Sequence, residues 1–208
     1  MSFWEWISLA GICFAGAASP GPSLAVVLGA VISGGRTHGV IAAWAHATGV
    51  GLYATLTVFG ISTVITLIPG LFRGIQVAGA LYLLWLAAKL LRSTGDPVDP
   101  GREIAGRAFG AARDGFAVAF LNPKLAVFML ALFSQFIKPD ASIATTALLI
   151  GTATTVDGVW YTLITVLVGQ QRWLDVLRRN AGLMDRVFGV LIAAVALSIL
   201  WLAATGST

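Results

Sequence analysis

The sequence has little charge for its length. Only 11% of its 208 residues are Asp, Glu, Lys or Arg, and 58% are hydrophobic, whereas soluble domains carry charge on about a quarter of their residues. So few charged groups cannot cover a surface that faces water on all sides. The composition therefore excludes an ordinary soluble domain and indicates an integral membrane protein embedded in a lipid bilayer.

Groups for metal, redox or nucleotide chemistry are also scarce. Cys13 is the only cysteine, so the chain cannot form an internal disulfide or a two-thiol relay. The sequence lacks a Cys/His cluster, acids at metal-ligand spacing and the Gly-rich loop that binds nucleotide phosphates. We therefore expect no metal, no cofactor, no enzymatic activity and no ATP hydrolysis, so an ion gradient would have to drive any transport.

Six apolar stretches are each long enough to cross about 30 Å of hydrocarbon as an α-helix. They cover residues 4–32, 40–69, 71–91, 115–137, 143–169 and 184–204. No Lys or Arg precedes Arg36, so the first stretch lacks the basic start of a signal peptide and is predicted to remain as a span. The alternating polarity of a membrane β-barrel is missing. The predicted fold class is an all-α integral membrane protein with six transmembrane helices.

Basic residues are distributed unevenly between the two sides of these spans. Loops 33–39, 92–114 and 170–183, with their flanks, carry ten Lys and Arg residues, and the opposite side carries two. Because basic loops stay in the cytoplasm, these three loops are predicted to be cytoplasmic and both termini to lie outside. The net charge of +4 thus reflects orientation in the membrane and does not indicate nucleic-acid binding.

The two halves of the chain share a short repeat. Residues 22–30 read PSLAVVLGA and residues 123–131 read PKLAVFMLA, with the proline at the same place in the first span of each half. Three spans per half give the halves opposite orientations, which is the inverted-repeat plan of many secondary transporters. The predicted organisation is a first three-helix repeat over 1–92, a cytoplasmic loop over 93–113 and a second repeat over 114–208.

Each repeat begins with a helix that proline interrupts, since proline removes an N–H donor and clashes with the preceding turn. In both, a capping residue precedes a proline at the first helical position, so each helix should restart at membrane depth. The free N–H groups of such restarts bind anions, although a packing kink is the alternative. The predicted substrate-binding residues at these interruptions are Ser19, Gly21, Pro22, Ser23, Asn122, Pro123 and Lys124.

Three ionisable residues lie deep in the predicted spans, where such groups are costly and commonly functional. Lys124 could hold a carboxylate, pair with an acid or extend to the interface. Asp157 could carry a coupling proton, bind an ammonium or balance Lys124, and His46 could relay protons or make a helix–helix hydrogen bond. Tyr53, Trp160 and Tyr161 could line a small substrate cavity or serve packing alone.

Together these features resemble the LysE/RhtB family of bacterial amino-acid exporters. The resemblance rests on the length, the six spans, the Ser-Pro-Gly-Pro of residues 19–22 and the Asn-Pro-Lys of residues 122–124. It implies export of L-amino acids by proton antiport through the bacterial inner membrane, and it suggests a homodimer. Because Asp157 is the only deep acid, we expect neutral substrates similar to threonine, homoserine or leucine.

Two other functions remain open from the sequence. A passive efflux channel would carry flux that is independent of the proton gradient. A non-transporting subunit of a membrane assembly would give no growth phenotype when amino acids or dipeptides are in excess.

Overall fold

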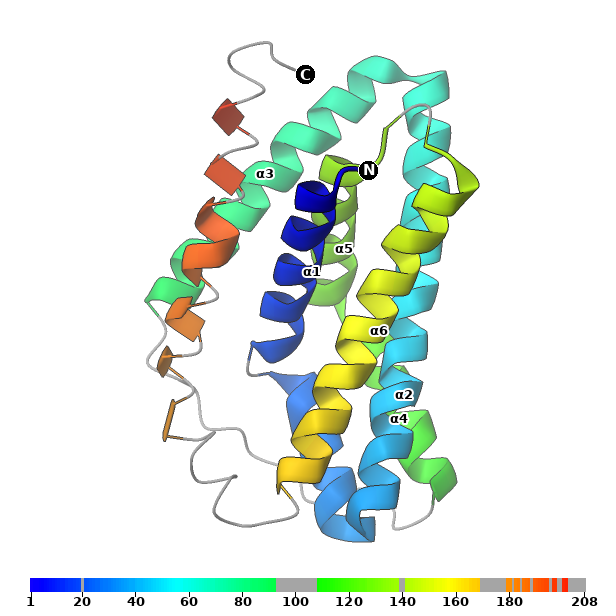
Figure 1. The fold of residues 1–208 in the computed structure, drawn as a ribbon, viewed down its shortest axis with the longest axis vertical. Helices are drawn as coiled ribbons and strands as arrows, with labels where there is room; N and C mark the ends of the chain where they lie inside the picture. The colour runs from blue at the N-terminus through cyan, green and yellow to red at the C-terminus, as the bar shows by residue number, and fades with distance from the viewer. Residues whose placement is uncertain are drawn as a thin grey trace.

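The structure of the chain, a computed structural model, is helical throughout the part that it describes (Figure 1). It describes residues 1–19, 21–92, 108–138, 141–168 and 179–201, the last range with gaps at 181, 184, 188, 195, 198 and 199. The helices are α1 (Phe3–Ala18), α2 (Pro22–Leu67), α3 (Pro69–Leu91), α4 (Ala108–Phe120), α5 (Pro123–Phe136) and α6 (Ile143–Val168). The prediction of a helical membrane protein is confirmed at this level.

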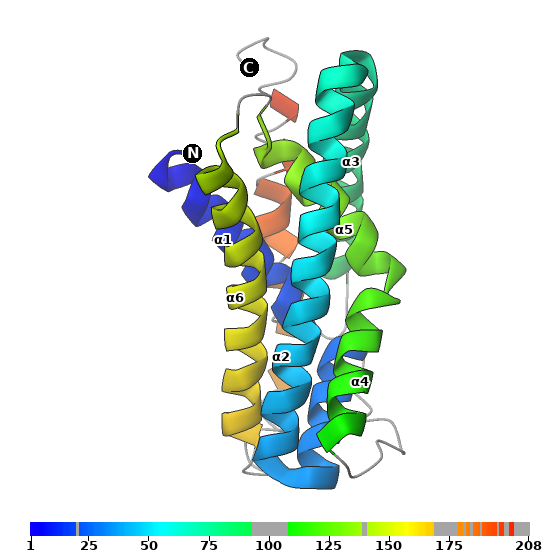
Figure 2. The ribbon, with the colours of Figure 1, turned by 90° about the vertical axis from the view of Figure 1, so that its right-hand side faces the viewer.

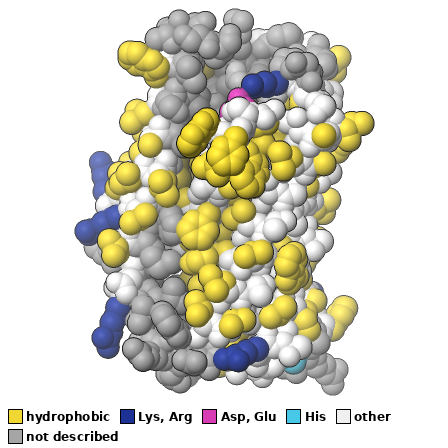
Figure 3. Space-filling view, viewed as in Figure 1, with side chains coloured by type: hydrophobic (Ala, Val, Ile, Leu, Met, Phe, Trp, Pro, Cys, Tyr) yellow, Lys and Arg dark blue, Asp and Glu magenta, His cyan; other side chains and the backbone are white. Residues whose placement is uncertain are grey.

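Several of the helices could cross a membrane by length and composition. Three described helices meet this test over Pro22–Ile61, Gly74–Leu91 and Ile143–Leu167, and a bent pair formed by α4 and α5 would be a fourth span. On the face shown in Figure 3, hydrophobic side chains cover the middle of the molecule, while basic side chains lie at its ends and along one edge. Such a belt suits a lipid environment.

The helix α2 reverses direction at a single residue. Gly35 has φ 75° and ψ −173°, the one described residue inside α2 with non-helical angles. Glycine adopts positive φ without a steric penalty because it has no Cβ. The chain therefore descends from Pro22, turns at the lower end of the bundle and rises to Leu67 (Figures 1 and 2). The predicted loop over 33–39 is thus reduced to this one turn.

The start of α4 also differs from the prediction. The helix begins at Ala108, inside the segment predicted as a loop, and not at residue 115. Residues 108–114 include Arg113 and Asp114, which form an exposed ion pair of 2.9 Å. Hydropathy detects contact with lipid, whereas a helix can continue into water when its residues favour it. The span was therefore predicted shorter than the helix.

Small residues allow the helices to pack closely around α2. A Cβ placed on Gly49 would lie 2.7 Å from Cβ of Ala119 in α4, and one placed on Gly51 would lie 2.7 Å from Oγ1 of Thr154 in α6. The absence of a side chain at these two positions therefore lets α4 and α6 approach α2 closely. The result is a tight unit of α2, α4 and α6, with α1, α3 and α5 packed beside it (Figure 2).

The two interrupted helices run in opposite directions through this bundle. In Figure 2, α1 and the first part of α2 descend, whereas α4 and α5 ascend. α1 packs against α6 and α5, and α5 packs against α3 and α2. The two interruptions therefore lie inside the bundle, where their free backbone groups must find partners.

Candidate functional site

The first interruption separates α1 from α2. Ser19 is the C-cap of α1, and Gly21, with an extended φ of 179°, is the N-cap of α2, which begins at Pro22. No side chain caps this N-terminus, because glycine offers none. Pro20 lies outside the described residues. The first turn of α2 therefore presents N–H groups that no side-chain cap occupies.

The second interruption is closed by its own capping residue. α4 ends at Phe120, and Asn122 accepts hydrogen bonds through Oδ1 from the backbone N of Lys124 at 3.0 Å and of Leu125 at 3.4 Å. Pro123 is the first residue of α5, and α4 and α5 meet at a bend of 57°. The helix thus restarts at the predicted proline, but its first N–H groups are already bonded to Asn122.

Two tyrosines satisfy carbonyl groups that the interruptions release. The Tyr161 hydroxyl of α6 donates to the carbonyl oxygen of Ala17, near the end of α1, at 3.0 Å. The Tyr53 hydroxyl of α2 donates to the carbonyl oxygen of Phe120, at the end of α4, at 2.7 Å. Each tyrosine thus lies in one half of the chain and bonds to the interruption in the other half. The carbonyls freed at helix ends need such partners in an apolar interior.

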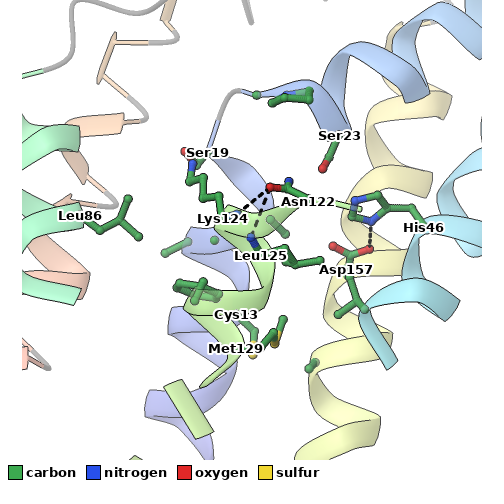
Figure 4. A pocket seen from close by; sticks show the side chains of 18 of the residues that line it. Cys13, Ser19, Ser23, His46, Leu86, Asn122, Lys124, Leu125, Met129 and Asp157 are labelled. Atoms are coloured by element: carbon green, nitrogen blue, oxygen red, sulfur yellow. Dashed lines mark hydrogen bonds and ion pairs between the residues drawn. The ribbon is translucent and has the colours of Figure 1, made fainter. Parts of the chain in front are cut away.

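A cavity lies between the two interruptions (Figure 4). Its volume is about 60 Å³, which is room for roughly four to six waters. Its polar lining comes from both interruptions and from α2, α5 and α6: Ser19, Gly21, Ser23, His46, Asn122, Lys124, Asp157 and Tyr161. Pro22 also lines it. The cavity is therefore a mixed polar and apolar chamber inside the bundle.

A buried, hydrogen-bonded pair of His46 and Asp157 forms one wall of the cavity. His46 Nδ1 lies 2.7 Å from Asp157 Oδ2, and the two residues are 1% and 5% exposed. The other imidazole nitrogen, Nε2, is buried without a hydrogen-bond partner in the described part of the chain. The Tyr161 ring meets the imidazole edge to face, with 5.1 Å between ring centroids. A histidine and a carboxylate in direct contact can exchange a proton with a ligand or with water.

Lys124 reaches the cavity from α5. Figure 4 shows its side chain extending toward Ser19, on the side of the cavity away from Asp157. The carboxylate of Asp157 is in direct contact with His46 and not with Lys124. Within the described residues, no ion pair of Lys124 is found. The side chain lines the cavity, so its ammonium is available to an anion that binds there.

The opposite wall of the cavity is apolar. It is formed by side chains of α3, α5 and the helical residues near 192: Leu86, Leu90, Leu125, Phe128, Met129 and Ile192. Figure 4 shows Leu86 on the side of the cavity opposite to His46 and Asp157. Cys13, the lone cysteine, lines the cavity from α1. The chamber thus has a polar side and an aliphatic side.

Two predicted substrate contacts are placed elsewhere. Neither Tyr53 nor Trp160 is among the residues that line the cavity. Tyr53 bonds to Phe120, and the Trp160 ring packs edge to face on Phe14 with centroids 4.9 Å apart. Both are aromatic residues near the middle of a span, and that position alone does not tell packing from ligand contact.

The sequence analysis did not single out several lining residues. The aliphatic residues Leu86, Leu90 and Ile192 line the cavity and carry no sequence signal beyond hydropathy. Tyr161, named with Tyr53 and Trp160 as a possible cavity wall, does line it. The described residues contain no group of three or more His, Cys, Asp or Glu side chains that could hold a metal ion. What the site offers is therefore acid–base and anion-binding chemistry.

Comparison with known proteins identifies the family. The LysE type translocator family matches residues 14–202 of the chain. The chain belongs to the LysE type translocator family. Its members are membrane transport proteins, so this translocator is a multi-pass membrane transporter and not an enzyme.

Curated relatives of this translocator come from enteric bacteria. The leucine efflux protein of Enterobacter sp. (strain 638) is 29% identical over 210 residues, which cover 94% of this chain and 93% of the relative. The uncharacterized membrane protein YahN of Escherichia coli (strain K12) is 30% identical over 181 residues, which cover 85% of this chain and 78% of the relative. No solved structure matches the chain at a significant level.

Proposed function

We propose that this translocator exports neutral L-amino acids from the cytoplasm across the bacterial inner membrane by proton antiport. The observation that carries the proposal is the buried His46–Asp157 pair on the wall of a cavity that both helix interruptions also line. An amino acid is a zwitterion, and the cavity offers groups for both of its charges. The names of the leucine efflux relatives add support for this class of substrate.

The substrate carboxylate binds at the first interruption in this proposal. The N-terminus of α2 carries no side-chain cap, and the Ser19 hydroxyl is buried without a partner in the described part of the chain. Lys124 extends toward Ser19 (Figure 4) and supplies a positive charge. Helix N-termini and a nearby cation both favour an anion.

The other two parts of the substrate face the two walls. The ammonium group lies toward the His46–Asp157 pair, and the side chain lies toward the aliphatic wall that includes Leu86 and Ile192. None of the described residues that form that wall is acidic, and an exporter of lysine or arginine would need an anion there for the distal cation. The substrate is therefore a neutral amino acid with an aliphatic or small side chain.

Protons and substrate compete for the same pair during the transport cycle. Substrate binding from the cytoplasm releases a proton from the pair, and protonation from outside displaces the ammonium group. Such competition makes exchange obligatory, because one group accepts either the proton or the substrate at a time. Export is then driven by the inward proton gradient.

We also propose the full architecture of six spans in two inverted three-helix repeats, with both termini outside. The opposite directions of the two interrupted helices (Figure 2) support this arrangement. The hydrogen bonds of Tyr53 and Tyr161, which cross between the halves, support it as well. Two similar bundles around one cavity are the arrangement that alternating access requires.

The first prediction tests proton coupling with Asp157→Asn. Asparagine keeps a hydrogen-bond acceptor for His46 but cannot carry the coupling proton, so the protein should fold while leucine accumulation in inside-out vesicles with an acidic lumen falls to background. Counterflow, in which labelled leucine exchanges for unlabelled leucine without a pH gradient, should persist at saturating leucine with a raised KM, because a neutral amide is a weaker partner for the substrate ammonium than a carboxylate. Radiolabelled uptake measures both rates.

Asp114→Asn is the matched control, because Asp114 lies on α4 in an exposed ion pair with Arg113 and does not line the cavity. Its gradient-driven rate should equal that of the wild type. If wild-type flux changes neither with an imposed pH gradient nor with an uncoupler, the protein is a passive channel instead. Absence of any amino-acid flux in the wild type would identify a non-transporting subunit.

A further inference from the structure

Tyr161 connects the first interruption to the buried His46–Asp157 pair. Its hydroxyl donates to the carbonyl of Ala17 before the interruption at 3.0 Å, and it also interacts with the Ser23 side chain after the interruption. Its ring contacts His46 edge to face at 5.1 Å. The residue is 2% exposed, so its position is fixed by these contacts. One side chain thus touches both ends of the interruption and one member of the pair.

We propose that Tyr161 is a positioning residue that couples protonation of the His46–Asp157 pair to the shape of the first interruption. This inference rests on the proposed proton-coupled transport. A change in the charge or place of the imidazole moves the ring against which it packs, and the ring carries the hydroxyl that holds Ala17 and Ser23. Packed interiors transmit such small displacements because they contain little free space.

The equivalent tyrosine provides an internal contrast. Tyr53 makes the same kind of bond, to the Phe120 carbonyl at 2.7 Å, at the second interruption. Its ring packs on Phe120 with centroids 5.3 Å apart, and it does not line the cavity. Tyr53 therefore holds a helix end without contacting the His46–Asp157 pair. Tyr161 holds a helix end and also contacts His46.

The other titratable groups around the pair are few. Cys13 faces the cavity from α1 and Lys124 from α5, and Tyr161 itself lies on α6 beside Asp157. In the described part of the chain, His46 is the one titratable residue of α2 that lines the cavity, and no titratable residue of α3 or α4 lines it. Tyr161 is the one among these that contacts both His46 and the interruption.

The second prediction compares Tyr161→Phe with Tyr53→Phe in proteoliposomes. Each variant keeps the ring and removes one hydroxyl that bonds to a helix-end carbonyl, so their losses of thermal stability in detergent should be similar. Tyr161→Phe should lower the ratio of gradient-driven export to counterflow about tenfold, the size of one lost buried hydrogen bond, and should change the pH profile of export. Tyr53→Phe should leave that ratio and the profile at wild-type values.

Several outcomes would overturn this inference. If both variants lower gradient-driven export and counterflow in equal proportion, Tyr161 is a structural brace like Tyr53. If Tyr161→Phe does not fold, Ser23→Ala removes the other contact of the hydroxyl and should lower the same ratio several-fold, and an unchanged ratio in that variant refutes the inference. Failure of wild-type export to respond to a pH gradient would instead refute the proposed function.

Discussion

The two helix interruptions look alike in sequence and differ in how their backbone groups are satisfied. At the first, Gly21 leaves the start of α2 without a side-chain cap, and the Ser19 hydroxyl is buried without a partner among the described residues. At the second, Asn122 bonds to two N–H groups of α5. An N–H group that is already bonded cannot bind a substrate at the same strength.

This difference suggests a division of labour within the cavity. The first interruption offers open N–H groups to a carboxylate, whereas the second offers a fixed helix that carries Lys124. The positions are equivalent in the repeat, where Ser23 matches Lys124. A symmetric architecture can thus hold an asymmetric site, because one residue before each proline decides whether the helix end is open or closed.

Among changes at the two interruptions, the largest effect on KM is expected from removing the positive charge of Lys124 at the second interruption. In Lys124→Gln the substrate carboxylate loses a charged partner, which is worth about 1.5 to 3 kcal/mol. The KM for leucine should therefore rise roughly 10- to 100-fold, as measured by initial rates of export over a range of substrate concentrations.

Lys138→Gln is the control for this change. Lys138 forms an exposed ion pair with Glu5, at 3.0 Å between Nζ and Oε1, and does not line the cavity. Its KM should stay at the wild-type value. A Lys124→Gln variant with unchanged KM would show that the ammonium takes no part in binding, and the carboxylate site would then rest on the first interruption alone.

A smaller effect on KM is expected from removing the Asn122 side chain that caps α5 at the second interruption. Asn122→Ala removes the cap of α5, which typically costs about 1 kcal/mol of stability, so the apparent midpoint of thermal unfolding in detergent should fall. Ser2→Ala removes the cap of α1, whose Oγ accepts from the Glu5 backbone at 3.2 Å, and should cost a similar amount. Asn122→Ser, which retains a capping oxygen, should restore most of the loss.

Comparing the KM of Asn122→Ala with that of Lys124→Gln distinguishes a residue that stabilises the helix from one that binds the substrate. Because the N–H groups at Asn122 serve the helix, KM should change less in Asn122→Ala than in Lys124→Gln. An increase in KM as large as that of Lys124→Gln, with no loss of stability, would contradict the division of labour between the interruptions.

The smallest effect on KM is expected from adding a capping side chain at residue 21, before the start of α2. Gly21→Asn gives α2 the same cap as α5, and the added carbonyl oxygen competes with the substrate carboxylate for the first N–H groups. Stability should rise by a few tenths of a kcal/mol, while KM should rise about threefold, within the range of one neutral hydrogen bond. Both quantities can be measured on the same purified protein.

Gly21→Ala is the matched control, because it adds a Cβ without a capping group. The nearest atom to that Cβ would be the Ser19 carbonyl oxygen at 3.9 Å, and the extended φ of 179° suits any residue. KM should therefore remain at the wild-type value. Equal increases in KM for both variants would point to a steric effect at residue 21 and not to competition for N–H groups.

Much of the fold could be predicted because it depends on local chemistry. Long apolar runs give helices in lipid, and proline at the first position of a helix gives the restarts at Pro22 and Pro123. Helix ends in water were predicted less well. The turn at Gly35 is shorter and the start of α4 at Ala108 is earlier than expected, because hydropathy measures burial in lipid and does not measure where a helix ends.

The sequence by itself determined the class of the protein, the two interruptions and the set of rare ionisable groups within apolar spans. Only the tertiary structure decided which groups meet. His46 and Asp157 are 111 residues apart in the chain, and Tyr53, predicted as a substrate contact, proved to brace Phe120. Such pairings depend on how helices cross and rotate about their axes, and packing between distant segments sets that geometry.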